Sequence, residues 1–158
     1  MFRLQSTAFP PDAAIPTTYT GRGLDRSPPL RWSGAPRDTK SYALIMHDPD
    51  ARAGSADFAH WVLFNMPAAR SELPEDSPHT GDLTDGTIQG RNDFDRIGYG
   101  GPNPPPGKPH RYRFELFALD SPLELDSGAS RAAIEVAMQG HVLGRAELVG
   151  TYRNRGRA

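Results

Sequence analysis

The sequence predicts a mostly β fold in a single domain, and three observations lead to this prediction. The chain has 158 residues, close to the usual size of one domain, and it shows no internal repeat or domain boundary. It contains 16 glycines and 16 prolines, about a fifth of all residues, which interrupt helices and central strands. Several segments nevertheless have strand character. A helical bundle does not accommodate so many turn residues, whereas a β-rich domain with long ordered loops does.

Three long strands are predicted. Residues 41–47 and 58–66 are nearly continuous apolar runs, typical of strands covered on both faces. Residues 112–119 begin by alternating, with Tyr112 and Phe114 on one face and arginines on the other. Shorter strands are predicted over residues 2–5, 30–32 and 147–152.

One helix is predicted near the C-terminus, over residues 130–143. Its apolar face would hold Ile134, Met138, His141 and Val142, which recur at helical spacing. Ser127 or Ser130 would cap its start and Gly144 would end it. A short helix is also predicted over residues 71–75, and the segment 98–109, with four glycines and five prolines, is predicted to be a rigid loop.

Charge and composition exclude several functions. The net charge of −1 does not suit a nucleic-acid-binding surface. Without cysteine there can be no disulfide, thiol catalysis or thiolate metal site. No segment resembles a signal peptide or a membrane span, so we expect a cytoplasmic protein. The basic tail of Arg153, Arg155 and Arg157 is expected to be solvated and frayed.

Three ionisable residues stand at the ends of apolar strands. Register places His110 with Tyr112, Asp48 with Met46, and His60 with Phe58, Val62 and Phe64. Burying such groups is costly unless they are paired, so the three side chains are candidates for one site. The alternative remains open, because single histidines are often core residues and Asp48-Pro49-Asp50 is typical of a turn.

The other histidines are not assigned to this site. His47 points to the opposite face from Asp48, His79 lies in a polar loop and is expected to be exposed, and His141 is expected to be structural. We expect no metal and no cofactor. The sequence has no pair of histidines at metalloprotease spacing, no phosphate-binding GxxxxGK[ST] loop and no GxSxG nucleophile elbow.

Four motifs in order resemble the phosphatidylethanolamine-binding protein family, and most closely its bacterial Raf kinase inhibitor-like branch. The resemblance covers nearly the whole chain. The motifs are Ser27-Pro28-Pro29-Leu30 with Trp32; Asp48-Pro49-Asp50-Ala51 with His60-Trp61; Gly98-Tyr99-Gly100-Gly101-Pro102 with His110-Arg111-Tyr112; and Gly140-His141-Val142-Leu143 with Gly150-Thr151-Tyr152.

The resemblance implies a β-sandwich of two sheets with a few peripheral helices. It also implies a small pocket for an anion, such as the phosphate of a phospholipid head group, a free phosphate or a carboxylate. A homodimer and an unidentified protein partner are compatible with it. By the resemblance, the ligand-binding residues are Asp48, His60, Gly100, Gly101, Pro102, His110 and Tyr112, with the glycine amides close to the anion.

Three departures from the family pattern bear on ligand identity: Arg52 replaces a proline, Asp95 a glycine and Asn103 a cysteine. The favoured function is the binding of a small anion, with regulation of a partner protein as a further expectation. The alternative is an enzyme that uses the aspartate and two histidines for proton transfer in a lyase, cyclase or hydrolase step. Binding is favoured because the sequence shows no activated nucleophile.

Overall fold

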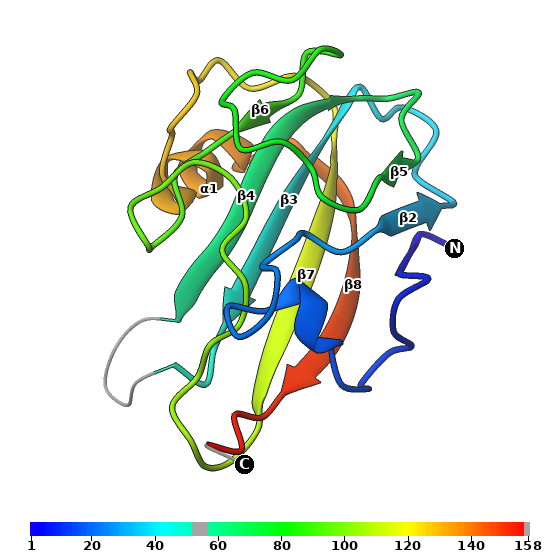
Figure 1. Cartoon of the computed structure of the whole chain (residues 1–158). Coiled ribbons are helices and arrows are strands. Elements are labelled where there is room, and N and C mark those ends of the chain that lie inside the picture. The colour runs from blue at the N-terminus through cyan, green and yellow to red at the C-terminus, as the bar shows by residue number, and fades with distance from the viewer. Residues whose placement is uncertain (52–56, 157–158) are drawn as a thin grey trace.

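The computed structural model describes residues 1–51 and 57–156, and it confirms a mostly β architecture of two sheets with one helix near the C-terminus (Figure 1). The small antiparallel sheet has the order β1-β2-β5, and the large one has the order β6-β4-β3-β7-β8. The strands are β1 (Arg3–Gln5), β2 (Leu30–Ser33), β3 (Ser41–Asp48), β4 (Phe58–Pro67), β5 (Glu72–Leu73), β6 (Ile88–Gln89), β7 (His110–Leu119) and β8 (Val142–Tyr152). The helices are the 3₁₀ turn η1 (Thr17–Tyr19) and α1 (Arg131–Met138).

Strand β3 is the centre of the large sheet, and all eight of its residues are buried. Its two faces contribute to two separate cores. Leu44 and Met46 belong to the core that the large sheet shares with Leu30 and other residues of the small sheet. Ala43 and Ile45 belong to the core on the other face, beneath α1, which is completed by residues such as Val62, Phe64, Ile134 and Met138. The continuous apolar run of β3 therefore reflects burial on both sides.

An irregularity in the pairing of β3 with β4 decides where His60 lies. Met46 pairs with Trp61, but the next residue, His47, pairs with Ala59, so His60 is an extra residue without a partner. Such a bulge turns one side chain away from regular alternation. The sequence prediction that His60 shares a face with Val62 and Phe64 is therefore wrong, because those two residues pack beneath α1 whereas His60 contacts the ring of Tyr112.

The short helix predicted over residues 71–75 is wrong, because the segment forms β5. Leu73 pairs with Leu30 of β2 and is buried, and the Trp32 amide donates to the Ser71 carbonyl. Pairing with β2 buries Leu73 and extends the small sheet. The stabilisation from this pairing is greater than that from local helix propensity.

The C-terminal helix is shorter than predicted. Ser130 caps it as expected, since the Ala133 amide donates to the Ser130 hydroxyl, but α1 ends at Met138. Gly140 follows with φ of 82°, a left-handed conformation that stops helices, and the chain continues directly into β8. Gly144 therefore lies within β8 and does not end the helix. His141 is outside the helix, and its side chain is 44% exposed and paired with Asp120.

The basic tail is not frayed as far as the structure describes it, to residue 156. Asn154 is buried, its side-chain amide donates to the Pro104 carbonyl, and its side-chain oxygen accepts from the Gly156 amide. The amide of Gly107 also donates to the Asn154 carbonyl. These bonds fix Arg153 and Arg155 beside the proline-rich loop, while Arg157 lies outside the described residues.

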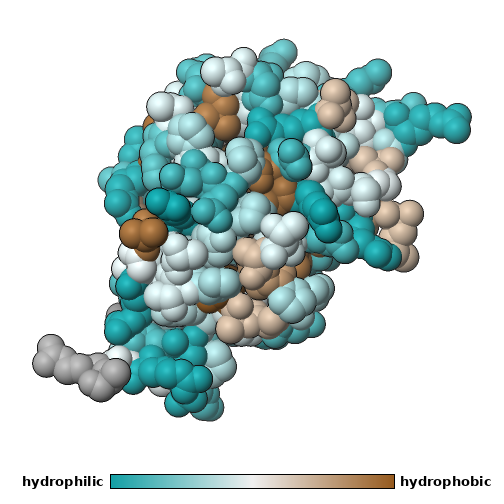
Figure 2. Space-filling view, turned by 45° about the vertical axis from the view of Figure 1, so that its right-hand side comes forward, coloured by the Kyte–Doolittle hydropathy of each residue, from teal (hydrophilic) through white to brown (hydrophobic). Residues whose placement is uncertain are grey.

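The face shown in Figure 2 is mostly hydrophilic, and its strongly apolar residues occur as small separate spots. The large hydrophobic side chains with exposed surface come from distant parts of the chain: Met1, Leu24, Phe94, Val136, Val142 and Leu143. Across residues 1–51 and 57–156, no helix is both long and apolar enough to cross a membrane.

Candidate functional site

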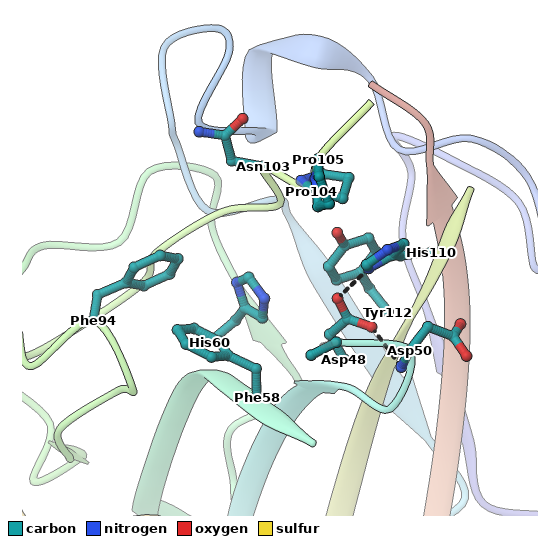
Figure 3. A pocket seen from close by; sticks show the side chains of 11 residues that line it. Asp48, Asp50, Phe58, His60, Phe94, Asn103, Pro104, Pro105, His110 and Tyr112 are labelled. Atoms are coloured by element: carbon teal, nitrogen blue, oxygen red, sulfur yellow. Dashed lines mark hydrogen bonds and ion pairs between the residues drawn. The ribbon is translucent and has the colours of Figure 1, made fainter. Parts of the chain in front are cut away.

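A cavity of about 420 Å³ lies where β3 ends, β4 begins and β7 begins (Figure 3). The candidate residues Asp48, His60, His110 and Tyr112 all face it, although they come from three strands. The structure therefore brings together the ionisable residues at the strand ends. The cavity is lined by Asp48, Asp50, Ala51, Phe58, His60, Phe94, Asn103, Pro104, Pro105, His110 and Tyr112.

Asp48 and His110 form a tight pair on one side of the cavity. The His110 Nδ1 atom lies 2.7 Å from Asp48 Oδ2, and the Asp48 side chain is only 6% exposed. The second carboxylate oxygen of Asp48 accepts from the Asp50 amide at 2.8 Å, so Asp48 also forms the turn predicted at this position. Because a carboxylate can only accept, Nδ1 of His110 carries the proton and Nε2 is the ring nitrogen left for a ligand.

His60 occupies the other side of the cavity and is 4% exposed. Its Nδ1 donates to the Gly100 carbonyl at 2.6 Å, which assigns the proton to Nδ1 because a carbonyl only accepts. Burial lowers the pKa of His60, although the Gly100 carbonyl and the charge of Asp48 act in the opposite direction. His60 is therefore neutral at pH 7, with an unprotonated Nε2. That atom has no protein partner in the part of the chain described, yet it is not fully buried.

Aromatic rings surround His60. Phe58 and Phe94 are 5.0 and 5.3 Å from the His60 ring between centroids, and the Tyr112 ring is at 5.3 Å, nearly perpendicular. Burial raises the pKa of the Tyr112 hydroxyl, and the negative charges of Asp48 and Asp50 raise it further. The cavity thus has an apolar wall beside its polar groups.

The glycine loop does not present its amides to the cavity, which corrects the expectation drawn from the resemblance. The Gly100 amide donates to the His60 carbonyl at 3.0 Å, and the Gly101 amide donates to Asp25 Oδ1 at 2.7 Å. The Pro102 carbonyl accepts from Gly21. None of the three loop residues lines the cavity. Their role in the structure is to hold the loop against β4 and the N-terminal segment.

Steric fit explains why glycine occupies positions 100 and 101. A Cβ atom at Gly100 would lie 2.4 Å from the Phe94 ring, and one at Gly101 would lie 2.5 Å from the Tyr19 carbonyl oxygen. Either contact is too close for a side chain. The glycines therefore allow the loop to approach Phe94 and η1, and Phe94 in turn forms part of the cavity wall.

The three departures from the family pattern lie in different places. Asn103 lines the cavity. Asp95 pairs with Arg91 and has φ of 65°, the left-handed region that glycine adopts most easily, which fits the glycine common at this position in the family. Arg52 lies outside the described residues.

Sequence reasoning missed much of the cavity wall, namely Phe58, Phe94, Pro104 and Pro105, and it missed Asp50. Asp50 accepts from the Arg111 amide at 2.9 Å and pairs with its guanidinium, which lowers the pKa of Asp50. The motif Asp48-Pro49-Asp50 was a usable signal for this residue. Within residues 1–51 and 57–156, no group of three histidine or acidic side chains is arranged to hold a metal ion.

A buried ionic network lies on the opposite face of β3, directly behind Asp48. The His47 ring lies between two carboxylates, with Nδ1 2.8 Å from Asp57 Oδ2 and Nε2 2.6 Å from Glu115 Oε1. Arg131 of α1 pairs with Asp57, and Arg145 of β8 pairs with Glu115. The His47 hydrogen bond lowers the pKa of Glu115, with the arginine charges contributing. Burial acts to raise the pKa of Asp57, but the contacts with Arg131 and His47 outweigh this effect, and the net result is a lowered pKa.

Comparisons with family models, related sequences and solved structures all point to the same family. A family model described as phosphatidylethanolamine-binding protein matches residues 5–153. A UPF0098 protein of Methanothermobacter thermautotrophicus is 49% identical over 150 residues, which are 95% of this chain and 97% of that protein. The crystal structure of Escherichia coli YbcL, described as a new member of the mammalian family, superposes with a TM-score of 0.88 at 36% identity and covers 97% of this chain and 98% of YbcL.

A second solved structure agrees with these. The crystal structure of a putative phosphatidylethanolamine-binding protein homologue from Chlamydia trachomatis gives a TM-score of 0.88 at 36% identity and covers 97% of both chains. The family model, the relatives and the two-sheet fold all agree with the motifs that enclose the cavity. The chain therefore belongs to the phosphatidylethanolamine-binding protein family.

Proposed function

We propose that the cavity binds a small oxyanion, a phosphate monoester or a carboxylate, between His60 and His110. The observation that carries this proposal is that both rings use Nδ1 for protein partners, Gly100 and Asp48, and keep Nε2 for the cavity. Two fixed ring nitrogens from different strands suit a ligand with two or more oxygens.

Charge limits the form in which the ligand binds. None of the described lining residues is a lysine or an arginine, whereas Asp48 and Asp50 carry negative charge. His60 is neutral, because burial lowers its pKa. A fully ionised phosphate would face a lone pair at His60 and repulsion from Asp48. A ring whose only proton is on Nδ1 offers an acceptor lone pair at Nε2, so an oxyanion binds between the two rings only with added protons, on the ligand or on the rings. The cavity therefore favours a protonated, singly charged phosphate over the fully ionised form.

The apolar wall indicates a ligand with a short organic part. Phe58, Phe94, Pro104 and Pro105 leave room beside the two histidines in a cavity of about 420 Å³. A phosphate esterified to a small group such as ethanolamine fits this volume better than a bare phosphate. Regulation of a partner protein by the occupied cavity remains a prediction from the family resemblance.

Binding is proposed in preference to catalysis. Among the described lining residues the one hydroxyl is that of Tyr112, and burial raises its pKa, which makes it a poor nucleophile. The Asp48–His110 pair can equally serve to fix the ring of His110 for binding.

Calorimetry with phosphate and phosphoethanolamine tests the proposal. We expect His60→Gln and His110→Gln each to weaken binding by about 10- to 150-fold, the equivalent of one lost hydrogen bond to a charged group. His79→Gln is the matched control, because His79 is exposed and lies outside the cavity. Wild-type affinity in both cavity variants, or no binding to the wild-type protein at millimolar ligand, would contradict the proposal.

A further inference from the structure

A second cleft, separate from the histidine cavity, is surrounded by arginines. It has a volume of about 750 Å³ and lies between η1, the end of β8 and the residues that follow β8. We call it the arginine cleft, and it contains Arg22, Arg153 and Arg155. Its other lining residues are Ala14, Ile15, Pro16, Thr17, Pro109, Thr151, Tyr152 and Gly156, so no acidic residue is among those described.

The three arginines differ from most other arginines of this protein. Within residues 1–51 and 57–156, no carboxylate lies within 4.0 Å of the guanidinium of Arg22, Arg153 or Arg155. Ion pairs are instead formed by Arg26, Arg70, Arg91, Arg111, Arg113, Arg131 and Arg145. Three of the described arginines without an ion pair therefore meet at one cleft.

Hydrogen bonds to the backbone hold two of these side chains in place. Arg22 donates from Nη2 to the Gly156 carbonyl at 3.3 Å, and Arg153 donates from Nε to the Gly107 carbonyl at 2.8 Å. Each bond uses one guanidinium N–H and leaves others free for a ligand. Buried Asn154 anchors the segment that carries Arg153 and Arg155. The arginines are therefore partly preorganised rather than part of a frayed tail.

Hydroxyl groups add further hydrogen-bonding capacity. The Thr17 and Tyr152 hydroxyls lie 3.4 Å apart in the cleft. Burial of Tyr152 acts to raise its pKa, but the hydrogen bond with Thr17 and the charge of Arg22 contribute to a net lowering. The lowered pKa of Tyr152 indicates a positive electrostatic potential at its hydroxyl.

We propose that the arginine cleft is a second anion site, which binds a ligand carrying one or more phosphate groups through Arg22, Arg153 and Arg155. Guanidinium groups bind phosphate oxygens in a bidentate manner, which suits a doubly charged phosphate. The two sites are close, because Tyr152 in the cleft pairs with His110 of the cavity across β7 and β8. This inference does not depend on the function proposed for the cavity.

The test compares two triple variants with the same change of net charge. Arg22→Gln/Arg153→Gln/Arg155→Gln removes the cleft charges, and Arg3→Gln/Arg31→Gln/Arg37→Gln removes three exposed arginines elsewhere. Binding is measured by calorimetry with pyrophosphate, and by co-sedimentation with phosphatidylcholine vesicles that contain phosphatidate. The first probe represents a soluble phosphate ligand and the second a lipid head group.

We expect the cleft variant to lose at least about tenfold in affinity for the probe that binds, while the control variant changes by less than about twofold. A His60→Gln/His110→Gln variant should retain this binding. The probe that shows the selective loss identifies the source of the phosphate. An equal loss in both triple variants, binding of neither probe to the wild-type protein, or a loss on removing the two histidines would overturn the proposal.

Discussion

The ionic network behind the cavity gives a quantitative prediction for Glu115→Gln. Glu115 is 12% exposed in its side chain, and its Oε1 atom lies 2.6 Å from Nε2 of His47, whose Nδ1 contacts Asp57. The substitution keeps the shape of the side chain and removes its charge. A hydrogen bond to a charged group contributes about 1.5–3 kcal/mol, so we expect the free energy of unfolding to fall by about that amount.

This energy converts to a shift in melting temperature. With an unfolding entropy of about 2.1 cal/mol/K per residue, the melting temperature of this 158-residue chain should fall by about 5–9 °C. Glu147→Gln is the matched control, because Glu147 forms a more exposed pair with Arg113 and should cost only about 0–1 kcal/mol. Calorimetric or circular-dichroism melting of both variants at pH 7 measures the difference.

The pH dependence of the effect follows from the lowered pKa of Glu115. A carboxyl group whose pKa is lower when folded contributes its full stabilisation above its ordinary pKa and loses it as the pH falls through the folded value. The difference in melting temperature between the wild-type and Glu115→Gln proteins should therefore have its full size at pH 6–7 and become smaller below about pH 4. Equal melting temperatures for Glu115→Gln and Glu147→Gln, or a gap that does not shrink in acid, would refute this reasoning.

Three further predictions concern the cavity and its loop. Asn154→Ala removes the hydrogen bond to the Pro104 carbonyl, so it should cost about 1–3 kcal/mol in denaturant unfolding and weaken phosphate binding at the cavity. Gly101→Ala should cost about 1–3 kcal/mol in the same assay, because its methyl group meets the Tyr19 carbonyl. Phosphate affinity, measured by calorimetry, should rise from pH 8 to pH 6, because the complex needs a proton that neutral His60 lacks; a flat profile counts against the proton requirement.

The architecture was largely predictable because it follows from burial. The apolar runs at residues 41–47 and 58–66 became strands buried on both faces, and the start of residues 112–119 alternates as predicted. Boundaries were less predictable, since residues 142 and 143, predicted as the end of the helix, belong to β8, which begins five residues before the predicted strand of residues 147–152. That choice depends on pairing with β7, which lies more than 20 residues earlier and is a tertiary contact.

Strand alternation correctly predicts the faces on which two of the candidate site residues lie, but not the face of the third. His110 shares a face with Tyr112, and Asp48 with Met46, as simple alternation requires. His60 reaches the cavity only because a bulge in β4 interrupts that alternation, and no feature of the local sequence indicates the bulge. The glycine loop was assigned the wrong contacts, because whether an amide faces a ligand or a neighbouring carbonyl depends on how distant segments pack.

The most direct test of the anion site is a two-dimensional NMR titration of the histidine rings with phosphoethanolamine. We expect the signals of His60 and His110 to shift together and to saturate at one ligand concentration, while those of exposed His79 and of His141 beside Asp120 stay unchanged. Unshifted signals of His60 and His110 at millimolar ligand, or equal shifts in all four residues, would contradict the claim that these two rings bind the anion.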